Sequence, residues 1–78
     1  MKEGYLNLNE SGRYELLDEQ GNYLTYFTCG ELIDIYDPDK GEWLQGRIEH
    51  DDNYNGYYFF NPNGRHRSLC NGVRARIL

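Results

Sequence analysis

The sequence lacks a long apolar run and contains only two cysteines. No stretch approaches the roughly 20 apolar residues that a membrane-spanning helix needs, and the opening residues MKEGYLNLN have no apolar signal-peptide core. These absences favour a cytoplasmic protein without membrane association. In that compartment Cys29 and Cys70 would stay reduced. Their spacing leaves open whether they form a disulfide, because pairing depends on geometry.

The sequence also lacks helical periodicity. No ten-residue stretch places apolar residues at positions i, i+3, i+4 and i+7, so we expect no α-helix beyond one 3₁₀ turn near residues 68–71. Short segments rich in aromatic and β-branched residues alternate with polar turns that contain Gly, Asn or Pro, which is typical of β-strands. The sequence therefore predicts an all-β protein.

The strand pattern occurs in residues 4–8, 14–18, 23–28, 31–36, 43–48, 56–61 and 73–77, so we expect about six or seven short antiparallel strands. Because a chain of 78 residues forms one domain with a thin core, this number fits a small, partly open SH3-like barrel over residues 1–78. Residues 1–28 would supply a lead-in hairpin and a third strand, and residues 29–78 the barrel core.

Matching the apolar faces of neighbouring strands predicts their register, since a slip of one residue would turn every side chain to the other face. In the central hairpin, Ile35 should lie opposite Leu44. The full set of expected pairs is Leu6–Leu16 and Leu8–Tyr14 in the first hairpin, and Ile33–Gly46, Ile35–Leu44 and Tyr36–Trp43 in the central one.

Alternation then assigns side chains to two faces. The expected core face of the central hairpin holds Ile33, Ile35, Leu44, Gly46 and Ile48, and the expected outer face holds Asp34, Tyr36, Trp43, Gln45 and Arg47. Gly46 has no side chain, so we expect a bulge or bend there.

In the aromatic strand that follows, alternation points either Tyr58 and Phe60 or Tyr57 and Phe59 inward, and we favour Tyr58 and Phe60. The last strand should point Val73, Ala75 and Ile77 inward, with Leu69 as an anchor before it.

Charge is unevenly distributed along the chain, whose net charge is 8 − 13 = −5. Residues 1–61 hold all thirteen acids and four basic residues, a net of −9. Residues 62–78 hold no acid and four arginines, a net of +4; these are Arg65, Arg67, Arg74 and Arg76. Either the acidic strands fold against the basic segment, or the arginines contact an anion such as a nucleic-acid phosphate.

Residues with catalytic or metal-binding chemistry form no recognisable motif. Cys29 has no signature of a nucleophile paired with His50 or His66, and the set Cys29, His50, His66 and Cys70 lacks the close ligand pairs of structural zinc sites. The turn at residues 37–41 has its glycine one position too early for a calcium-binding EF-hand loop. We therefore expect no enzyme, no metal and no cofactor.

Two binding hypotheses remain. In the first, Tyr36, Trp43 and Tyr57 form an outer aromatic patch that contacts a protein partner, because Trp and Tyr dominate interface hot spots. A cation-binding cage is a narrower version of this hypothesis. In the alternative, nucleic acid binds to the C-terminal arginines (residues 65, 67, 74 and 76), although the acidic remainder of the chain would repel a polyanion.

Two resemblances accompany these residues. From Gly30 onward the chain resembles the SH3-like, Tudor-like pattern, in which W-x-x-G-x-I (residues 43–48) precedes an aromatic strand and a final strand beginning with Val73. Nearly the whole chain resembles an uncharacterised family of small proteins in Firmicutes and their mobile elements, a domain of unknown function. The matching segments are GRYE at 12–15, TCGE at 28–31, EW at 42–43, RIEH at 47–50, GYY at 56–58 and VR at 73–74. This resemblance implies an origin in a bacterium, phage or conjugative element, and no activity.

Overall fold

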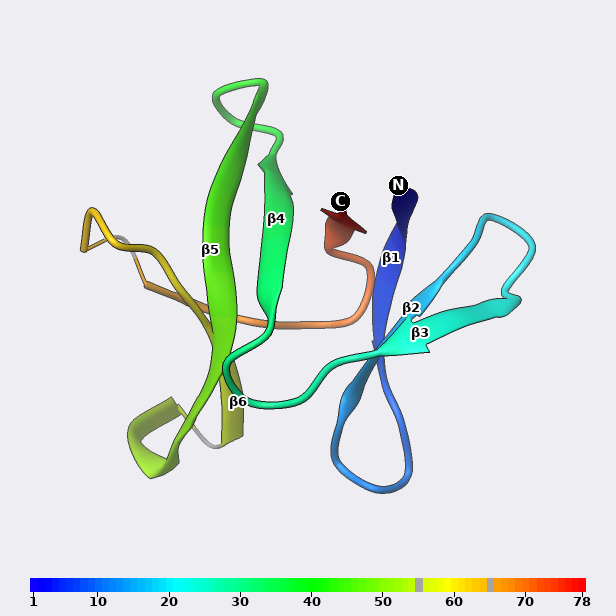
Figure 1. Cartoon of the computed structure of the whole chain (residues 1–78), viewed down its shortest axis with the longest axis horizontal. Coiled ribbons are helices and arrows are strands. Elements are labelled where there is room, and N and C mark those ends of the chain that lie inside the picture. Colours follow the sequence, from blue (N-terminus) through cyan, green and yellow to red (C-terminus); the bar gives the residue numbers. More distant parts are fainter. Residues whose placement is uncertain (55, 65) are drawn as a thin grey trace.

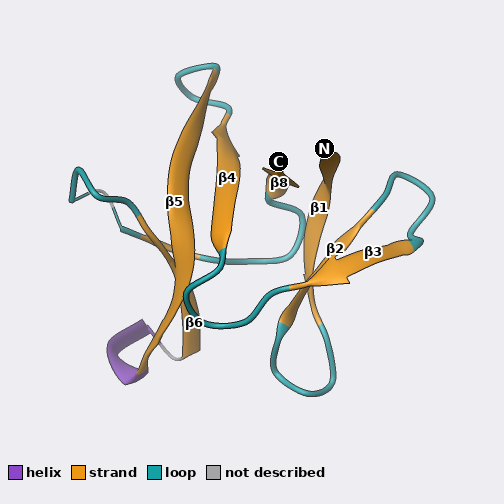
Figure 2. Ribbon diagram, viewed as in Figure 1, coloured by secondary structure: helices purple, strands orange, loops and turns teal. Residues whose placement is uncertain are grey.

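Eight antiparallel strands form one open sheet in the computed structural model, which describes residues 1–54, 56–64 and 66–78 (Figures 1 and 2). The strands are β1 (Lys2–Leu8), β2 (Tyr14–Leu17), β3 (Tyr23–Tyr26), β4 (Leu32–Asp37), β5 (Glu42–Asp51), β6 (Gly56–Phe60), β7 (Arg67–Ser68) and β8 (Arg74–Ile77). Their spatial order is β3-β2-β1-β8-β4-β5-β6-β7. The prediction of an all-β fold is confirmed, and the SH3-like assignment stays a prediction.

The two ends of the chain meet in the middle of the sheet. β1 pairs with β8, with Lys2 opposite Ile77, so the N- and C-terminal strands lie side by side (Figure 1). β8 also pairs with β4, which joins the first three strands to the β4–β5–β6 unit. Arg74 and Arg76 of β8 are thereby placed between the two acidic parts of the chain that supply β1 and β4.

The predicted registers of both hairpins are confirmed. Leu6 lies opposite Leu16 and Leu8 opposite Tyr14. In the central hairpin the pairs are Ile33–Gly46, Ile35–Leu44 and Tyr36–Trp43, as expected. Burial of one face imposes these registers, since a shifted strand would expose its apolar side chains.

The core lies on the inner face of the sheet, where side chains from both halves of the chain meet. Phe27 and Phe59 are its largest fully buried residues. Leu69 is buried as predicted, and its carbonyl oxygen accepts a hydrogen bond of 2.9 Å from the hydroxyl of Tyr14. The other buried apolar residues are Leu6, Leu16, Ile33, Ile35, Ile48 and Ala75.

The prediction that Tyr58 and Phe60 point inward is wrong. Phe59 is fully buried and lies opposite Ile48, its cross-strand partner in β5. Tyr57 packs against the same core. The strand GYYFF is aromatic on both faces, so alternation alone allows two assignments. The neighbouring strand decides between them, because Ile48 must face the core.

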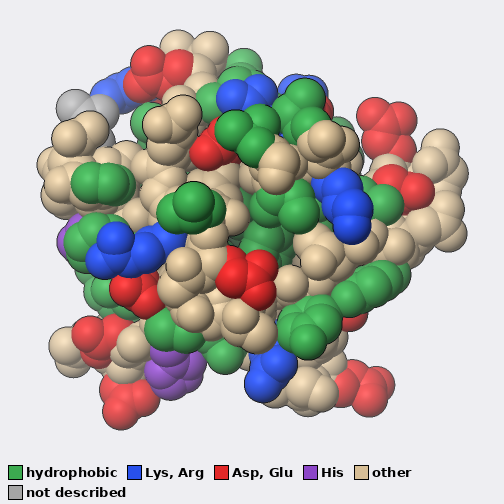
Figure 3. Space-filling model, in the orientation of Figure 1, with side chains coloured by type: hydrophobic (Ala, Val, Ile, Leu, Met, Phe, Trp, Pro, Cys, Tyr) green, Lys and Arg blue, Asp and Glu red, His purple; other side chains and the backbone are tan. Residues whose placement is uncertain are grey.

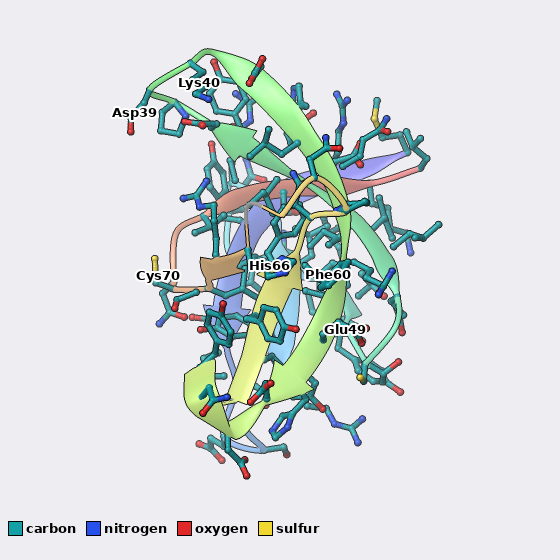
Figure 4. The ribbon with its side chains drawn as sticks, turned by 90° about the vertical axis from the view of Figure 1, so that its left-hand side faces the viewer. Asp39, Lys40, Glu49, Phe60, His66 and Cys70 are labelled. Carbon is teal, nitrogen blue, oxygen red and sulfur yellow. The ribbon has the colours of Figure 1, made fainter. Side chains whose placement is uncertain are left out.

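Gly46 does not mark a bulge. The pairing of β4 with β5 runs without a shift past this residue, and β5 is one long curved strand (Figure 4). An added Cβ at Gly46 would lie 2.2 Å from the carbonyl oxygen of Phe60 and 2.6 Å from the ring of Phe59. The glycine is therefore needed for close packing of β6 against β5.

The one 3₁₀ turn among the described residues is η1 (Asp52–Tyr54), and the expected turn at residues 68–71 is not found. The side chain of Asp51 accepts a hydrogen bond from the backbone N–H of Asn53, which favours the turn after β5. Near residue 70, the side-chain oxygen of Asn71 is instead bound to the backbone N–H of Leu8. Within the described part of the chain, no helix is long and apolar enough to cross a bilayer.

Candidate functional site

Tyr36 and Trp43 form a cross-strand pair on the outer face of the sheet, opposite the core. Their ring centroids are 5.3 Å apart at an interplanar angle of 64°, an edge-to-face arrangement. Both side chains are half-buried, while their neighbours Ile35 and Leu44 pack toward the core. Trp43 therefore lies on the outer face of the sheet, as alternation predicted.

Arginines from β8 cover this aromatic pair. The guanidinium carbon of Arg76 lies 4.1 Å from the Trp43 ring centroid, and that of Arg74 lies 5.5 Å from the Trp43 ring and 5.4 Å from the Tyr36 ring. These distances allow cation–π attraction. The four residues Tyr36, Trp43, Arg74 and Arg76 are called the aromatic–arginine layer below.

Each arginine of the layer also has a carboxylate partner. Arg76 donates from Nε to Asp34 at 3.1 Å, and Arg74 donates from Nε and Nη2 to one oxygen of Glu3. The bond to Glu3 raises the pKa of Arg74. The pair of Arg76 and Asp34 is the least exposed, with side-chain exposures of 25% and 11%. Acidic strands therefore do fold against the basic C-terminal segment.

This pairing mixes the two signs of charge in space although they are segregated in sequence. On the face drawn in Figure 3, acidic, basic and hydrophobic side chains are interspersed. A third ion pair joins Arg47 Nε to Glu49 at 2.8 Å, within β5 itself. The outer face therefore carries little net charge near the aromatic–arginine layer.

Tyr57 does not extend the aromatic patch, contrary to the hypothesis that joins it to Tyr36 and Trp43. It lies on the core face of β6, and its ring contacts His50 edge-on at 5.0 Å between centroids. The outer face is continued instead by Phe60, which lies opposite Arg47 and 4.1 Å from its guanidinium carbon. Tyr57 was expected on the outer face because the alternation predicted for β6 was shifted by one residue.

A groove of about 450 Å³ lies beside the aromatic–arginine layer. Arg76, Asp34, Arg47 and Phe60 line it, together with two leucines that sequence reasoning did not select. Leu32 and Leu78 are 78% and 90% exposed. The doublet Leu32–Ile33 was an available signal, because in a strand only one of two successive apolar residues can face the core. This space is called the outer groove below.

The aromatic rings near β6 contact one another closely. Tyr54 stacks on Tyr58 with 4.2 Å between ring centroids. His66 stacks on Phe60 with 4.3 Å between ring centroids (Figure 4). Arg47 lies against the same Phe60 ring. Stacking covers one face of each of these rings, and the Arg47 guanidinium adds cation–π attraction at Phe60.

The arginines of the nucleic-acid hypothesis fall into separate places. Arg74 and Arg76 share the outer face, as alternation predicted. Arg67 lies in β7 and lines a second pocket of about 380 Å³ together with Arg74. Arg65 lies outside the described residues. Arg67 and Arg74 thus line the same pocket, whereas Arg76 lines the outer groove.

A family model described as "Domain of unknown function (DUF5348)" matches residues 4–77. The chain belongs to the DUF5348 family. No curated protein and no solved structure matches it. The resemblance to a family of unknown function is therefore confirmed, and the family assigns no activity to the outer face.

Cys29 of this DUF5348 chain has a local environment that disfavours the thiolate. Its Sγ donates a hydrogen bond to Oε1 of Glu49 at 3.1 Å, and this bond is the main cause that raises the pKa of Cys29. The pKa of Glu49 is lowered, chiefly by the hydrogen bond from Arg47. A protonated thiol is a poor nucleophile and a poor metal ligand.

We predict that Glu49→Gln makes Cys29 more reactive toward iodoacetamide at pH 8. A raised pKa means a smaller thiolate fraction at that pH, and loss of the Glu49 charge removes part of the cause. The measurement is the alkylation rate against pH in a Cys70→Ser background. The pH midpoint should fall in the variant, and an unchanged midpoint would contradict a contribution of the Glu49 charge to the raised pKa of Cys29.

The two cysteines are both free and exposed. The Cys29 side chain is hydrogen-bonded to Glu49. Glu49 and Cys70 lie on opposite sides of the molecule (Figure 4). The intramolecular disulfide that the sequence left open is therefore not formed. Among the residues that the structure describes, no group of three or more His, Cys, Asp or Glu side chains lies close enough to hold a metal ion.

Proposed function

We propose that this chain is a non-enzymatic binding module of a bacterium, phage or mobile element. In the cytoplasm it would contact a partner protein through the aromatic–arginine layer and the outer groove. The observation that carries the proposal is the position of the groove. It places the exposed side chains of Leu32 and Leu78 beside a layer of Trp, Tyr and Arg. The partner would fill the groove with an apolar side chain.

The residue types of this surface support a protein contact. Trp, Tyr and Arg are the residues most enriched among interface hot spots, and buried interface centres are apolar. Trp43 is already held by Arg76 and Tyr36, and Arg76 is held by Asp34. A surface ordered before binding loses less side-chain entropy when the partner docks. Leu32 and Leu78 would then supply apolar area that is in contact with water in the free protein.

The proposal predicts that Leu32→Ser abolishes capture of a specific partner. Tagged wild-type protein is used to capture proteins from a bacterial lysate, the enriched protein is identified and purified, and its affinity is measured by calorimetry. We expect Leu32→Ser to weaken binding at least about tenfold, because the groove loses an apolar wall. Thermal unfolding should be unaffected, since Leu32 is largely exposed.

Leu8→Ser is the matched control, because Leu8 is 46% exposed but lies in β1 and does not line the groove. Its affinity for the purified partner should equal that of the wild type. Equal weakening by both substitutions, or none by Leu32→Ser, would remove the outer groove from the proposal. Light scattering of the free protein identifies the remaining case, in which the groove is filled by a second copy of the chain.

Nucleic-acid binding by the C-terminal arginines has less support. Arg74 and Arg76 are each bound to a carboxylate, so a phosphate would have to compete with Glu3 or Asp34. The remainder of the chain carries a net charge of −9 over residues 1–61, which opposes the approach of a polyanion. The neighbouring rings of Tyr36 and Trp43 could stack on bases only if Arg74 and Arg76, which cover them, moved away.

A further inference from the structure

A second pocket, of about 380 Å³, opens between the β4–β5 turn and the loop that leads into β8. Tyr36, Pro38 and Val73 form its apolar lining, and two arginines, Arg67 and Arg74, also line it. The turn that carries Asp39 and Lys40 and the loop that carries Cys70 lie on the same side of the molecule in Figure 4. This space is called the arginine pocket.

The two guanidinium groups retain donors for a ligand. Glu3 accepts from Nε and Nη2 of Arg74 through one of its oxygens. A guanidinium has five N–H donors, so the Nη1 group and the second N–H of Nη2 remain. None of the three ion pairs found among the described residues involves Arg67. Among the described residues, those that line the pocket include no acid.

We propose that the arginine pocket binds a carboxylate from an acidic segment of the partner protein. Planar carboxylates match the fork of an arginine side chain and accept two parallel hydrogen bonds. The apolar lining by Tyr36, Pro38 and Val73 fits the carbon atoms of the side chain that carries the carboxylate. This inference rests on the proposed function, which makes the partner a protein. It adds that the partner presents a carboxylate.

An acidic protein segment fits better than a nucleic acid. A planar carboxylate accepts two parallel hydrogen bonds from one guanidinium, and the carbon atoms of its side chain fit the apolar lining, whereas a nucleic-acid phosphate has no apolar side chain to fill that lining. The pocket also adjoins the outer groove along β4: Asp34 lines the groove and Tyr36 lines the pocket. Two residues of a strand span about 7 Å, so one partner segment can occupy both sites.

The test is a titration of ¹⁵N-labelled protein with an acetylated hexaglutamate peptide at about 50 mM ionic strength, where electrostatic contacts are strong. We expect saturable shifts of the backbone amide signals of residues 70–74, which line the pocket or adjoin it. Arg67→Gln should weaken this binding about tenfold, as expected for the loss of a charge-assisted hydrogen bond. Parallel titrations use inorganic phosphate and a ten-residue oligothymidylate.

Arg13→Gln is the matched control, because it removes the same charge from a residue that lies before β2 and outside the pocket. Its affinity for hexaglutamate should be unchanged. The inference is overturned if the peptide causes no saturable shift, if both substitutions weaken binding equally, or if oligothymidylate binds this site more tightly than the peptide. Tighter binding of phosphate than of the peptide would identify a phosphate site and also overturn it.

Failure of this inference is separable from failure of the proposed function. Leu32→Ser should leave hexaglutamate binding unchanged, because Leu32 does not line the arginine pocket. A natural partner that is lost by Leu32→Ser but retained by Arg67→Gln would support the outer groove and reject the arginine pocket. A natural partner that is lost by Arg67→Gln but retained by Leu32→Ser would support the arginine pocket and reject the outer groove.

Discussion

Replacing Phe59 with alanine is expected to destabilise the protein by about 3–5 kcal/mol, the usual cost of removing a buried aromatic ring. Phe59 is a fully buried residue of the core and lies opposite Ile48 of β5. A domain of this size has a total stability of about 4–12 kcal/mol, so this one change consumes much of the stability. Urea denaturation followed by circular dichroism measures the loss.

Phe60→Ala is the matched control, since the two neighbouring residues are chemically identical and point to opposite faces. Phe60 contacts Arg47 and His66 on the outer face, and loss of these contacts should cost about 1 kcal/mol. The alternation expected from the sequence, with Phe60 inward, predicts the opposite order. A larger loss for Phe60→Ala would therefore show that β6 is assigned to the wrong face.

Substituting Gly46 with alanine is expected to destabilise the protein by about 3 kcal/mol or more, at the upper end of the cost of overpacking. The added Cβ would approach the Phe60 carbonyl oxygen to 2.2 Å and two atoms of the Phe59 ring to 2.6 and 2.7 Å. A backbone carbonyl in a paired strand cannot move away without breaking the pairing of β5 with β6. We expect a fall in the thermal midpoint of about 12 °C or more.

Gly12→Ala separates this crowding from the general effect of replacing a glycine. Gly12 has a φ of 80° in the first hairpin turn, and an added Cβ there would meet no atom within 4 Å. Its cost should be limited to about 1–2 kcal/mol of backbone strain. Equal losses in the two variants would mean that the close approach of β6 to Gly46 does not exist in solution.

The local pattern of the chain predicted the class of fold and two hairpin registers because each depends on neighbouring residues. The pairing of Ile35 with Leu44 follows from a short turn and two apolar faces that must coincide. The strand pattern missed only β7, which has two residues and is too short for any periodicity. The 3₁₀ turn was misplaced because it is favoured by a hydrogen bond from the Asn53 N–H to the Asp51 side chain. Asp and Asn residues in other polar loops can form similar side-chain-to-backbone bonds, so the sequence does not single out this one.

The candidate site was predicted only in part. Tyr36 and Trp43 were correctly paired on the outer face because they are neighbours across one hairpin. Tyr57 was misplaced because the side-chain directions of β6 depend on Ile48 in the preceding strand. The outer groove was not predicted, since Leu32 and Leu78 lie far apart in sequence and meet only where β8 pairs with β4.

The all-β class, the two hairpins and the outward positions of Arg74 and Arg76 follow from alternation and turn chemistry within short stretches of the sequence. The folded chain sets which carboxylates those arginines meet, which face of β6 is buried and where the two pockets lie. These features depend on contacts between residues distant in sequence, such as Glu3 with Arg74 and Asp34 with Arg76. They exist only once the first and last strands pair in the middle of the sheet.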